Sequence, residues 1–411
     1  MALYIHVLAG LSTPEVHTAS SREMIAGCYD KSQNLLFSRP VFLPRYYHFR
    51  GEFHQRRGMK IATLQFAPRL GDVEGNIRRA NDLLKRGKDG LSIESMRPEI
   101  LVLPELAFSG YNFPSLEAIK PYLESQSTGP TAKWAQETAK RLRCKICVGY
   151  PEIEKATSSS SPENGNSNPL SSDDKYYNSL LVVDEYGTIL HNYRKRFLYY
   201  TDETWASEGD AERSFYTFNF DGISQQQNKI QTTFGICMDI NPYKFEAPFT
   251  DWEFANRVID SKSPLVILSM AWLTLLGHEE LAALRDKPDM DTFQYWIRRF
   301  WPLLEKKMEH DGDVDGTSGL TKKVIIVFAN RAGEEPGAEG KDPARYAGSS
   351  AVVAVTQKPR SSAEGGAPEF DVKILCWDIM GAAEEGLCFA DTKADPKLVF
   401  GLVPRSDSDS D

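Results

Sequence analysis

The sequence lacks several features that would assign a protein to a class at once. No apolar run approaches the ~20 residues that a membrane-spanning helix needs, so no membrane attachment is expected. Acidic side chains outnumber basic ones, 57 against 48, and the net charge of −9 argues against a nucleic-acid binder. Six cysteines in 411 residues do not make a disulfide framework, which favours a reducing intracellular setting and a cytoplasmic location.

Metal-binding patterns are also scarce. The seven histidines show no H-x-x-x-H or similar spacing. Cys144 and Cys147 form a C-x-x-C pair, which can mark a redox site or half of a zinc site. However, no second pair with zinc-ligand spacing follows, and the run continues as a predicted strand. We therefore expect no metal site.

Residues 1–58 are expected to form a poorly ordered extension. The opening stretch MALYIHVLAGL has no basic region and no clear cleavage site, and the acids that follow make mitochondrial targeting a weak alternative. One domain is expected from 59 to 404, followed by an acidic, disordered tail at 405–411. Four insertions are expected within the domain, at 154–174, 275–322, 334–346 and 358–369. The first is polar and low in complexity, and the last two are rich in turn residues and expected to be solvated.

The expected domain alternates between strand-like and helix-like hydrophobic periods. Strands are predicted where apolar or β-branched runs occur, as in KIATLQF, EILVLP, KICVGYPE, IQTTFGIC, PLVILSM, KKVIIVFAN, SAVVAV and VKILCWD. A hairpin with a turn at Gly187 is predicted over 178–195. Helices are predicted at 76–87, 131–143, 251–260 and 290–308. Strands alternating with helices indicate an α/β protein, and the short turns between several strands indicate mixed sheets.

Three residues with chemical potential each follow a predicted strand, where α/β proteins usually place their sites. They are Glu105, Lys195 and Cys237. A glutamate after a buried strand is expensive to bury without partners, and a cysteine is a nucleophile only when a base or cation favours its thiolate. Taken singly, each also fits a structural interpretation: a solvent-facing acid, an exposed basic patch and a small core side chain.

The order and context of these residues resemble the carbon–nitrogen hydrolase, or nitrilase, superfamily. The chain has a strand followed by PE, then YRK, and then a strand ending in GICMD. This order is similar to the Glu–Lys–Cys pattern of the family. The family is also resembled by KIATLQFAP with GDVEGN and by YNSLLVVDEYGTIL. LPELAFSGYNF, YRKRFLYYTDETWASEG and FGICMDINPYKFEAPF resemble most the fungal protein N-terminal asparagine amidohydrolases. The resemblance implies a four-layer αββα sandwich and a cofactor-free amidohydrolase.

The resemblance also implies roles for the three residues. Cys237 would attack the side-chain amide of an N-terminal Asn or Gln and form a thioester. Glu105 would take the thiol proton, protonate the leaving ammonia and then activate water. Lys195 and the backbone N–H of Met238 would stabilise the negative oxygen of the tetrahedral species. The cation of Lys195 should also favour the thiolate.

Further site residues are expected around this centre. Glu203, preferred to its neighbour Glu208, is expected to position the lysine and the substrate. Asp239 is expected to bind the α-ammonium of the substrate, although an acid before Asn-Pro fits a turn equally well. Three more residues are expected to shape the pocket: Tyr111, Asn112 and Trp272.

The expected partners are flexible protein or peptide N-termini. In the family, the new acidic N-terminus can be arginylated and recognised for degradation in the N-degron pathway. Three alternatives remain open: a small-molecule amidase of another branch, a true nitrilase and an inactive binding scaffold. The sequence decides neither the preference between Asn and Gln nor the choice between monomer and dimer.

Overall fold

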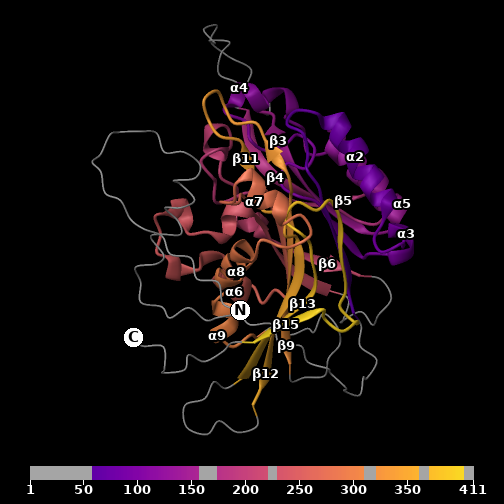
Figure 1. Ribbon diagram of the computed structural model, residues 1–411, viewed down its shortest axis with the longest axis vertical. Helices are drawn as coiled ribbons and strands as arrows, with labels where there is room; N and C mark the ends of the chain where they lie inside the picture. Colours follow the sequence, from indigo (N-terminus) through magenta and orange to yellow (C-terminus); the bar gives the residue numbers. More distant parts are fainter. Residues whose placement is uncertain (1–57, 157–173, 221–228, 310–320, 361–369, 402–411) are drawn as a thin grey trace, which may run out of the picture.

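The computed structural model describes residues 58–156, 174–220, 229–309, 321–360 and 370–401 (Figure 1). Apart from Gly58, the expected extension and the tail lie outside the described residues. Most residues of the expected insertions at 154–174 and 358–369 also lie outside the described residues.

Two mixed sheets form the centre of the molecule. The first has the order β14-β1-β2-β3-β4-β5, with strands β1 Lys60–Gln65, β2 Ile100–Val102, β3 Lys145–Glu154, β4 Lys175–Val183, β5 Ile189–Arg194 and β14 Gly386–Asp391. The second has the order β15-β13-β12-β9-β8-β7-β6, with strands β6 Phe215–Asn219, β7 Lys229–Ile236, β8 Leu265–Met270, β9 Lys322–Asn330, β12 Ala351–Pro359, β13 Phe370–Ile379 and β15 Leu398–Gly401. In each sheet three strands are parallel, β1-β2-β3 and β7-β8-β9, and their outer neighbours are antiparallel.

Helices and short turns complete the described chain. The α-helices are α2 Val73–Arg86, α3 Ile93–Met96, α4 Leu116–Ile119, α5 Pro130–Leu142, α6 Glu253–Asp260, α7 His278–Ala283, α8 Met290–Arg298 and α9 Pro302–Glu305. Turns of 3-10 helix are η1 Lys120–Tyr122, η2 Asp202–Thr204, η3 Ala211–Ser214, η4 Cys237–Ile240, η5 Tyr243–Phe245 and η6 Phe249–Asp251. A two-stranded ribbon pairs β10 Glu334–Glu335 with β11 Ala344–Arg345.

The sheets stack because successive strand side chains point to opposite faces. In β1, Ile61 belongs to a core shared with Phe234 of the second sheet. Its neighbours Ala62 and Leu64 belong to a different core, which includes Leu83 of α2. Figure 1 shows α2, α3 and α5 along one flank and α6, α8 and α9 on the other side of the strands. The molecule is therefore an αββα sandwich, which confirms the predicted fold class.

The differences from the predicted elements have simple physical causes. The predicted helix at 290–308 is divided, because a proline cannot continue a helix, and α9 begins at Pro302. The sequence pattern misses β6, β14 and β15, which all lie at sheet edges. An edge strand is covered less completely, so its hydrophobic pattern is weaker. The predicted strands KIATLQF, KICVGYPE and PLVILSM are confirmed as β1, β3 and β8.

Two of the predicted insertions contribute to the interior. Residues 275–322 include α8 and α9, whose side chains Trp296 and Leu303 are fully buried. The prediction of a solvated loop at 334–346 is wrong in part, because Glu335 and Tyr346 are buried. This loop turns out to support the site described below.

Glu124 is expected to make the stability of the fold depend on pH. It is buried before α5, where its carboxylate accepts hydrogen bonds from the Thr131 N–H (2.9 Å) and hydroxyl (2.7 Å). Burial raises the pKa of Glu124 from 4.5 to about 7, against the opposing effect of both Thr131 hydrogen bonds. The folded state thus keeps a proton that the unfolded state releases, so the contribution of Glu124 to the free energy of unfolding is complete at low pH. This contribution is at most roughly 3 kcal/mol, and it is lost as the pH rises through about 7.

The matched variant is Glu124→Gln, which cannot ionise. We expect it to gain stability relative to the wild type between about pH 5 and about pH 8, as measured by urea unfolding. Parallel stability curves for the two proteins over this interval would contradict the assignment.

Candidate active site

The structure brings the three predicted catalytic residues to one place between the two sheets. Glu105 follows β2 and Lys195 directly follows β5, both in the first sheet. Cys237 directly follows β7 of the second sheet. Lys195 Nζ lies 2.6 Å from Glu105 Oε1, and the charges of both residues act on the Cys237 thiol. The site therefore needs both sheets to be in place.

Cys237 occupies a strained turn at the end of its strand. Its φ angle is +43°, in the left-handed region that a residue other than glycine rarely adopts. The residue begins the turn η4, is 9% exposed and lines a pocket. Strain of this kind persists only where surrounding contacts fix the backbone, and it gathers at functional sites.

Asp239 supplies those contacts, and the prediction that it binds an α-ammonium is wrong. The carboxylate is fully buried and does not line the pocket. It accepts four hydrogen bonds, from the N–H groups of Ile236 (2.7 Å), Arg196 (3.1 Å) and Phe197 (2.9 Å) and from the Tyr193 hydroxyl (2.7 Å). With these partners it joins the segment after Lys195 to the turn that carries Cys237.

Lys195 is held by Asp202, and not by Glu203 as predicted. The lysine Nζ lies 2.6 Å from Asp202 Oδ2, and both side chains are fully buried. Glu203 is exposed, as is Glu208, which accepts a hydrogen bond from the Tyr243 hydroxyl. The predicted position is one residue too late, because the short turn η2 buries its first residue and exposes its second.

Glu105 has two further partners that sequence reasoning missed. Asn178 Nδ2 donates to Glu105 Oε1 (2.7 Å) and also to Asp202 Oδ1 (3.0 Å). The Ala271 N–H donates to Glu105 Oε2 (2.7 Å). Asn178 lies in the stretch YNSLL that resembles the family, but its neighbours in β4 gave no sign of its role. These contacts fix the carboxylate in one orientation, with Lys195 on one oxygen.

Burial and charge set the protonation of this cluster. Burial raises the pKa of Glu105, the lysine opposes that effect, and the charge of Asp202 adds to it. Burial disfavours the ammonium of Lys195, but the two carboxylates outweigh burial and its pKa is raised. Lys195 therefore stays a cation, while Glu105 accepts a proton more readily than an exposed glutamate does.

The cysteine rests as a thiol in this environment. Burial raises the pKa of Cys237 well above its ordinary value, and the Glu105 carboxylate adds to the effect. Lys195 and the Ala271 N–H act in the opposite direction and do not outweigh it. The charge of Lys195 therefore does not suffice to form the thiolate, and the thiol proton must move to a base, the role predicted for Glu105.

The pair Asp202 and Glu203 gives a matched test of the lysine contact. We expect Asp202→Asn to lower kcat/KM roughly 10²-fold, since an oriented cation that stabilises developing charge is worth about that much. Glu203→Gln is expected to leave kcat/KM unchanged for a peptide with an uncharged second residue, because the Glu203 side chain is exposed. Steady-state ammonia release from the two variants distinguishes them. A larger loss in Glu203→Gln would contradict the geometry.

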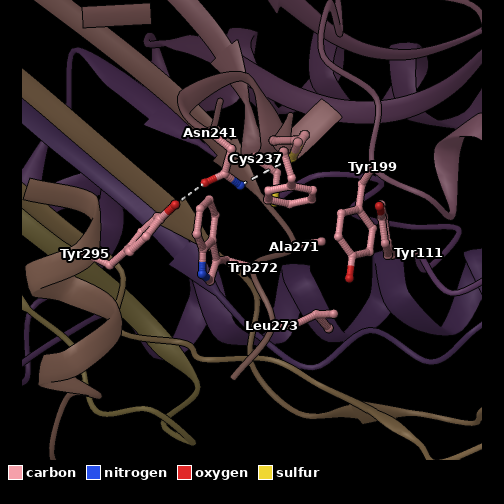
Figure 2. Close-up of a pocket in the computed structure, with 10 residues that line it drawn as sticks. Tyr111, Tyr199, Cys237, Asn241, Ala271, Trp272, Leu273 and Tyr295 are labelled. Carbon is pink, nitrogen blue, oxygen red and sulfur yellow. Dashed lines mark hydrogen bonds between the residues drawn. The ribbon is translucent and has the colours of Figure 1, made fainter. Parts of the chain in front are cut away.

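A largely aromatic pocket opens beside Cys237. It encloses about 530 Å³, including the part open to solvent. The residues lining it are Tyr111, Tyr199, Cys237, Met238, Asn241, Phe245, Ala271, Trp272, Leu273 and Tyr295. Figure 2 shows Tyr111 and Tyr199 on one side of Cys237, and Trp272 and Tyr295 on the other. Of the residues predicted to shape the pocket, Tyr111 and Trp272 do line it.

Asn112 does not line the pocket, and its side chain donates instead to the Pro336 carbonyl (2.8 Å). The backbone N–H groups of Tyr111 and Asn112 both donate to the buried carboxylate of Glu335. Glu335 is also paired with Arg331 (2.5 Å) and accepts a hydrogen bond from the Tyr346 hydroxyl (2.5 Å). The loop 334–346 thus fixes the wall of the pocket that carries Tyr111.

The C-x-x-C pair does not form a site within the described structure. Cys144 lies in the core beneath α2 and α5, whereas Cys147 lies in the core shared by the two sheets. Cys144 directly precedes β3 and Cys147 lies within it, and the two side chains pack on opposite faces of the sheet. Burial raises the pKa of Cys144 to about 12. Within the described residues, no group of three or more His, Cys, Asp or Glu side chains could hold a metal.

The chain matches a known family of enzymes. The family described as carbon-nitrogen hydrolase matches residues 60–242. The protein N-terminal amidase of Schizosaccharomyces pombe is 31% identical over 312 residues, which are 73% of this chain and 92% of that protein. The chain therefore belongs to the carbon–nitrogen hydrolase family, whose members hydrolyse carbon–nitrogen bonds such as those of amides. The predicted resemblance is confirmed.

Other relatives carry the same description. The protein N-terminal amidase of Saccharomyces cerevisiae is 28% identical over 311 residues, 60% of this chain and 64% of that protein. A crystal structure of an N-terminal amidase aligns with a TM-score of 0.59 and 23% identity, covering 82% of this chain and 98% of that one. Another, with a Gln-Gly peptide, aligns with a TM-score of 0.60 and 22% identity, covering 85% and 99%. At these identities the two crystal structures support the fold. No helix of the described residues is long and apolar enough to cross a membrane.

Proposed function

We propose that this protein deamidates N-terminal Asn, and also Gln, of proteins and peptides to Asp and Glu. The observation that carries the proposal is the buried Glu105–Lys195–Asp202 cluster set against Cys237 in a pocket that opens to solvent. Two fungal relatives are named protein N-terminal amidases. Structures of N-terminal amidases with Gln-Gly and Asn-Glu-Ala peptides share the fold.

The first half of the reaction replaces ammonia by the enzyme's sulfur. Glu105 takes the Cys237 thiol proton, and the sulfur attacks the side-chain amide carbon. The amide oxygen becomes negative, and the Lys195 ammonium and the Met238 N–H are the donors assigned to it. When the tetrahedral species collapses, the carbon–nitrogen bond breaks and Glu105 returns its proton to the leaving ammonia. A thioester with Cys237 remains.

The second half of the reaction restores the enzyme. Glu105, now a carboxylate again, removes a proton from a water molecule that attacks the thioester carbon. The carbon–sulfur bond then breaks, and the proton returns to the sulfur of Cys237. Lys195 stabilises the negative oxygen in this step as well, so one cation serves both tetrahedral species. Its contacts with Asp202 and Glu105 keep it in place throughout the cycle.

The α-ammonium of the substrate is assigned to aromatic faces and a neutral oxygen. No acidic side chain is among the described residues that line the pocket, now that Asp239 is accounted for elsewhere. Aromatic rings attract a cation over their faces, and Trp272, Tyr199 and Tyr295 supply such rings. The Asn241 amide oxygen, which accepts a hydrogen bond from the Tyr295 hydroxyl (2.7 Å), is a polar acceptor in the same pocket (Figure 2).

The test compares ammonia release from four compounds. They are a peptide beginning with Asn, the same peptide acetylated, a peptide beginning Val-Asn, and free asparagine. The proposal expects release only from the free Asn-first peptide, because the amide reaches Cys237 only when an α-ammonium and a following peptide bond are both present. Equal or faster release from free asparagine would instead support a small-molecule amidase. No release from any compound would support an inactive scaffold.

The cellular setting follows from this reaction as part of the proposal. A new N-terminal Asp or Glu is a substrate for arginyl transfer, which would place the enzyme upstream of N-degron recognition. We place it in the cytoplasm because the five described cysteines are free and buried, as suits a reducing compartment. Monomer and dimer both fit the proposal.

A further inference from the structure

An aromatic surface continues from the wall of the catalytic pocket to the exposed ring of Tyr200. Tyr199 and Phe245 line the pocket, with their ring centroids 6.1 Å apart. Tyr200 does not line it, but its ring lies 5.2 Å from that of Tyr199 and 5.7 Å from that of Phe245. Tyr200 is 40% exposed, one of few large hydrophobic side chains at that level among the described residues. We call these three residues the aromatic shelf.

The turn that carries Phe245 is strained. Lys244 and Phe245 have φ angles of +53° and +55°, so two consecutive residues other than glycine are left-handed. Such backbone conformations persist only where neighbouring contacts over-determine them. The contacts here are the Tyr243 N–H to Glu253 (3.1 Å) and the Tyr243 hydroxyl to Glu208 (2.8 Å). The turn is therefore held in a conformation that places an aromatic ring at the pocket.

The shelf has an occupant once a peptide is bound in the pocket. The first residue places its amide at Cys237, and the rest of the peptide must leave through the opening. The second side chain is the nearest one to the reacting residue, so it is the first to meet the protein surface around the opening. We propose that the aromatic shelf binds the side chain of the second substrate residue and favours an apolar or aromatic one. This inference rests on the proposed function, because it assumes that a peptide follows the reacting residue.

Charge around the shelf adds a second preference. Glu203 is exposed, and its N–H donates to the Tyr199 carbonyl (3.0 Å), so it lies on the same turn as the shelf tyrosines. Glu246 follows Phe245 and is also exposed, whereas Lys244 is the one exposed cation of this turn among the described residues. Like charges repel, so Asp or Glu should be the least favoured second residue.

The experiment measures kcat/KM for peptides that differ only in the residue after an N-terminal Asn: Phe, Leu, Gly or Glu. For the wild type we expect Phe to exceed Gly about five-fold, since roughly half of an aromatic side chain would be covered on an open shelf. Tyr200→Ala should reduce this Phe-to-Gly ratio to near one. The ratio is the readout because a general loss of activity affects both peptides alike.

Tyr186→Ala is the matched control. Tyr186 is 59% exposed and lies in the turn between β4 and β5, at the opposite end of β5 from Lys195. Its removal should leave the Phe-to-Gly ratio at the wild-type value. If all four peptides are deamidated at equal rates, or if Tyr200→Ala keeps the wild-type ratio, the shelf has no such role while the proposed function stands. If no peptide is deamidated, the proposed function itself fails.

Discussion

Replacing Cys237 with alanine is expected to abolish ammonia release from an Asn-first peptide. The side chain supplies the atom that bonds to the amide carbon, and no other described cysteine lines the pocket. Loss of a nucleophile that acts together with its base typically lowers kcat by ~10⁴-fold or more. A coupled assay for ammonia measures the loss directly. The fold should persist, because alanine fits the space that the thiol leaves.

The control for this variant is Cys144→Ala. Cys144 is also buried and free, but it lies in the core beneath the helices of the first sheet. Both variants therefore share any general effect of removing a buried thiol, but only Cys237→Ala removes the proposed nucleophile. We expect Cys144→Ala to retain catalysis. Activity in Cys237→Ala close to that of the control would contradict the assignment of the nucleophile.

Replacing Glu105 with glutamine is expected to lower kcat by about 10²–10⁴-fold, the range that general acid–base catalysis contributes. Glutamine keeps the size of the side chain and its place beside Lys195, but it cannot accept the thiol proton. Steady-state ammonia release from an Asn-first peptide measures this loss. A rate equal to that of the wild type would contradict the role of Glu105.

The pH profile of the wild type follows from the same residue. The base must be ionised in the free enzyme, and burial raises the pKa of Glu105 above 4.5. Activity should therefore be lost as the pH falls through that raised value, at a higher pH than an exposed glutamate would give. The acid limb of kcat/KM reports this group. A profile that stays flat down to the ordinary range of glutamate would show that the base is another residue.

The fold could be predicted where strands are buried on both sides. The central strands β2, β8 and β9 are continuous apolar runs, and a short run of that kind is typical of a strand covered on both faces. The edge strands β6 and β14 lack that signal because one side has no neighbouring strand. How the two sheets stack is decided by contacts between distant segments, which the family resemblance supplied and local patterns could not.

The meeting of Glu105, Lys195 and Cys237 at one place could be predicted because each of them follows a strand. Prediction failed for acids in turns. Asp202 and Glu203 are adjacent and chemically alike, and only the direction of a short turn decides which one meets Lys195. Asp239 looks available for a ligand in the sequence, yet donors from two separate segments fully occupy it.

Partners supplied by distant loops were beyond the reach of the sequence as well. Glu335 accepts hydrogen bonds from the backbone of Tyr111, more than two hundred residues earlier. Asn330 accepts one from the Trp272 N–H (2.7 Å) and so fixes the other wall of the pocket. Neither residue stands in a pattern that marks a site. Asn330 ends β9 of the second sheet, and Glu335 lies in the β10–β11 ribbon that follows it.

The most direct test of the whole account is a pre-steady-state experiment with an Asn-first peptide in excess. Ammonia is followed on the millisecond scale, and acid-quenched enzyme is analysed by mass spectrometry. Where hydrolysis of the thioester is the slower half of the reaction, the account predicts a burst of ammonia stoichiometric with enzyme, accompanied by an acyl adduct on the fragment containing Cys237. The acetylated peptide should give neither. Ammonia release without any adduct on Cys237, at a rate that Cys237→Ala matches, would contradict a thioester mechanism at this site.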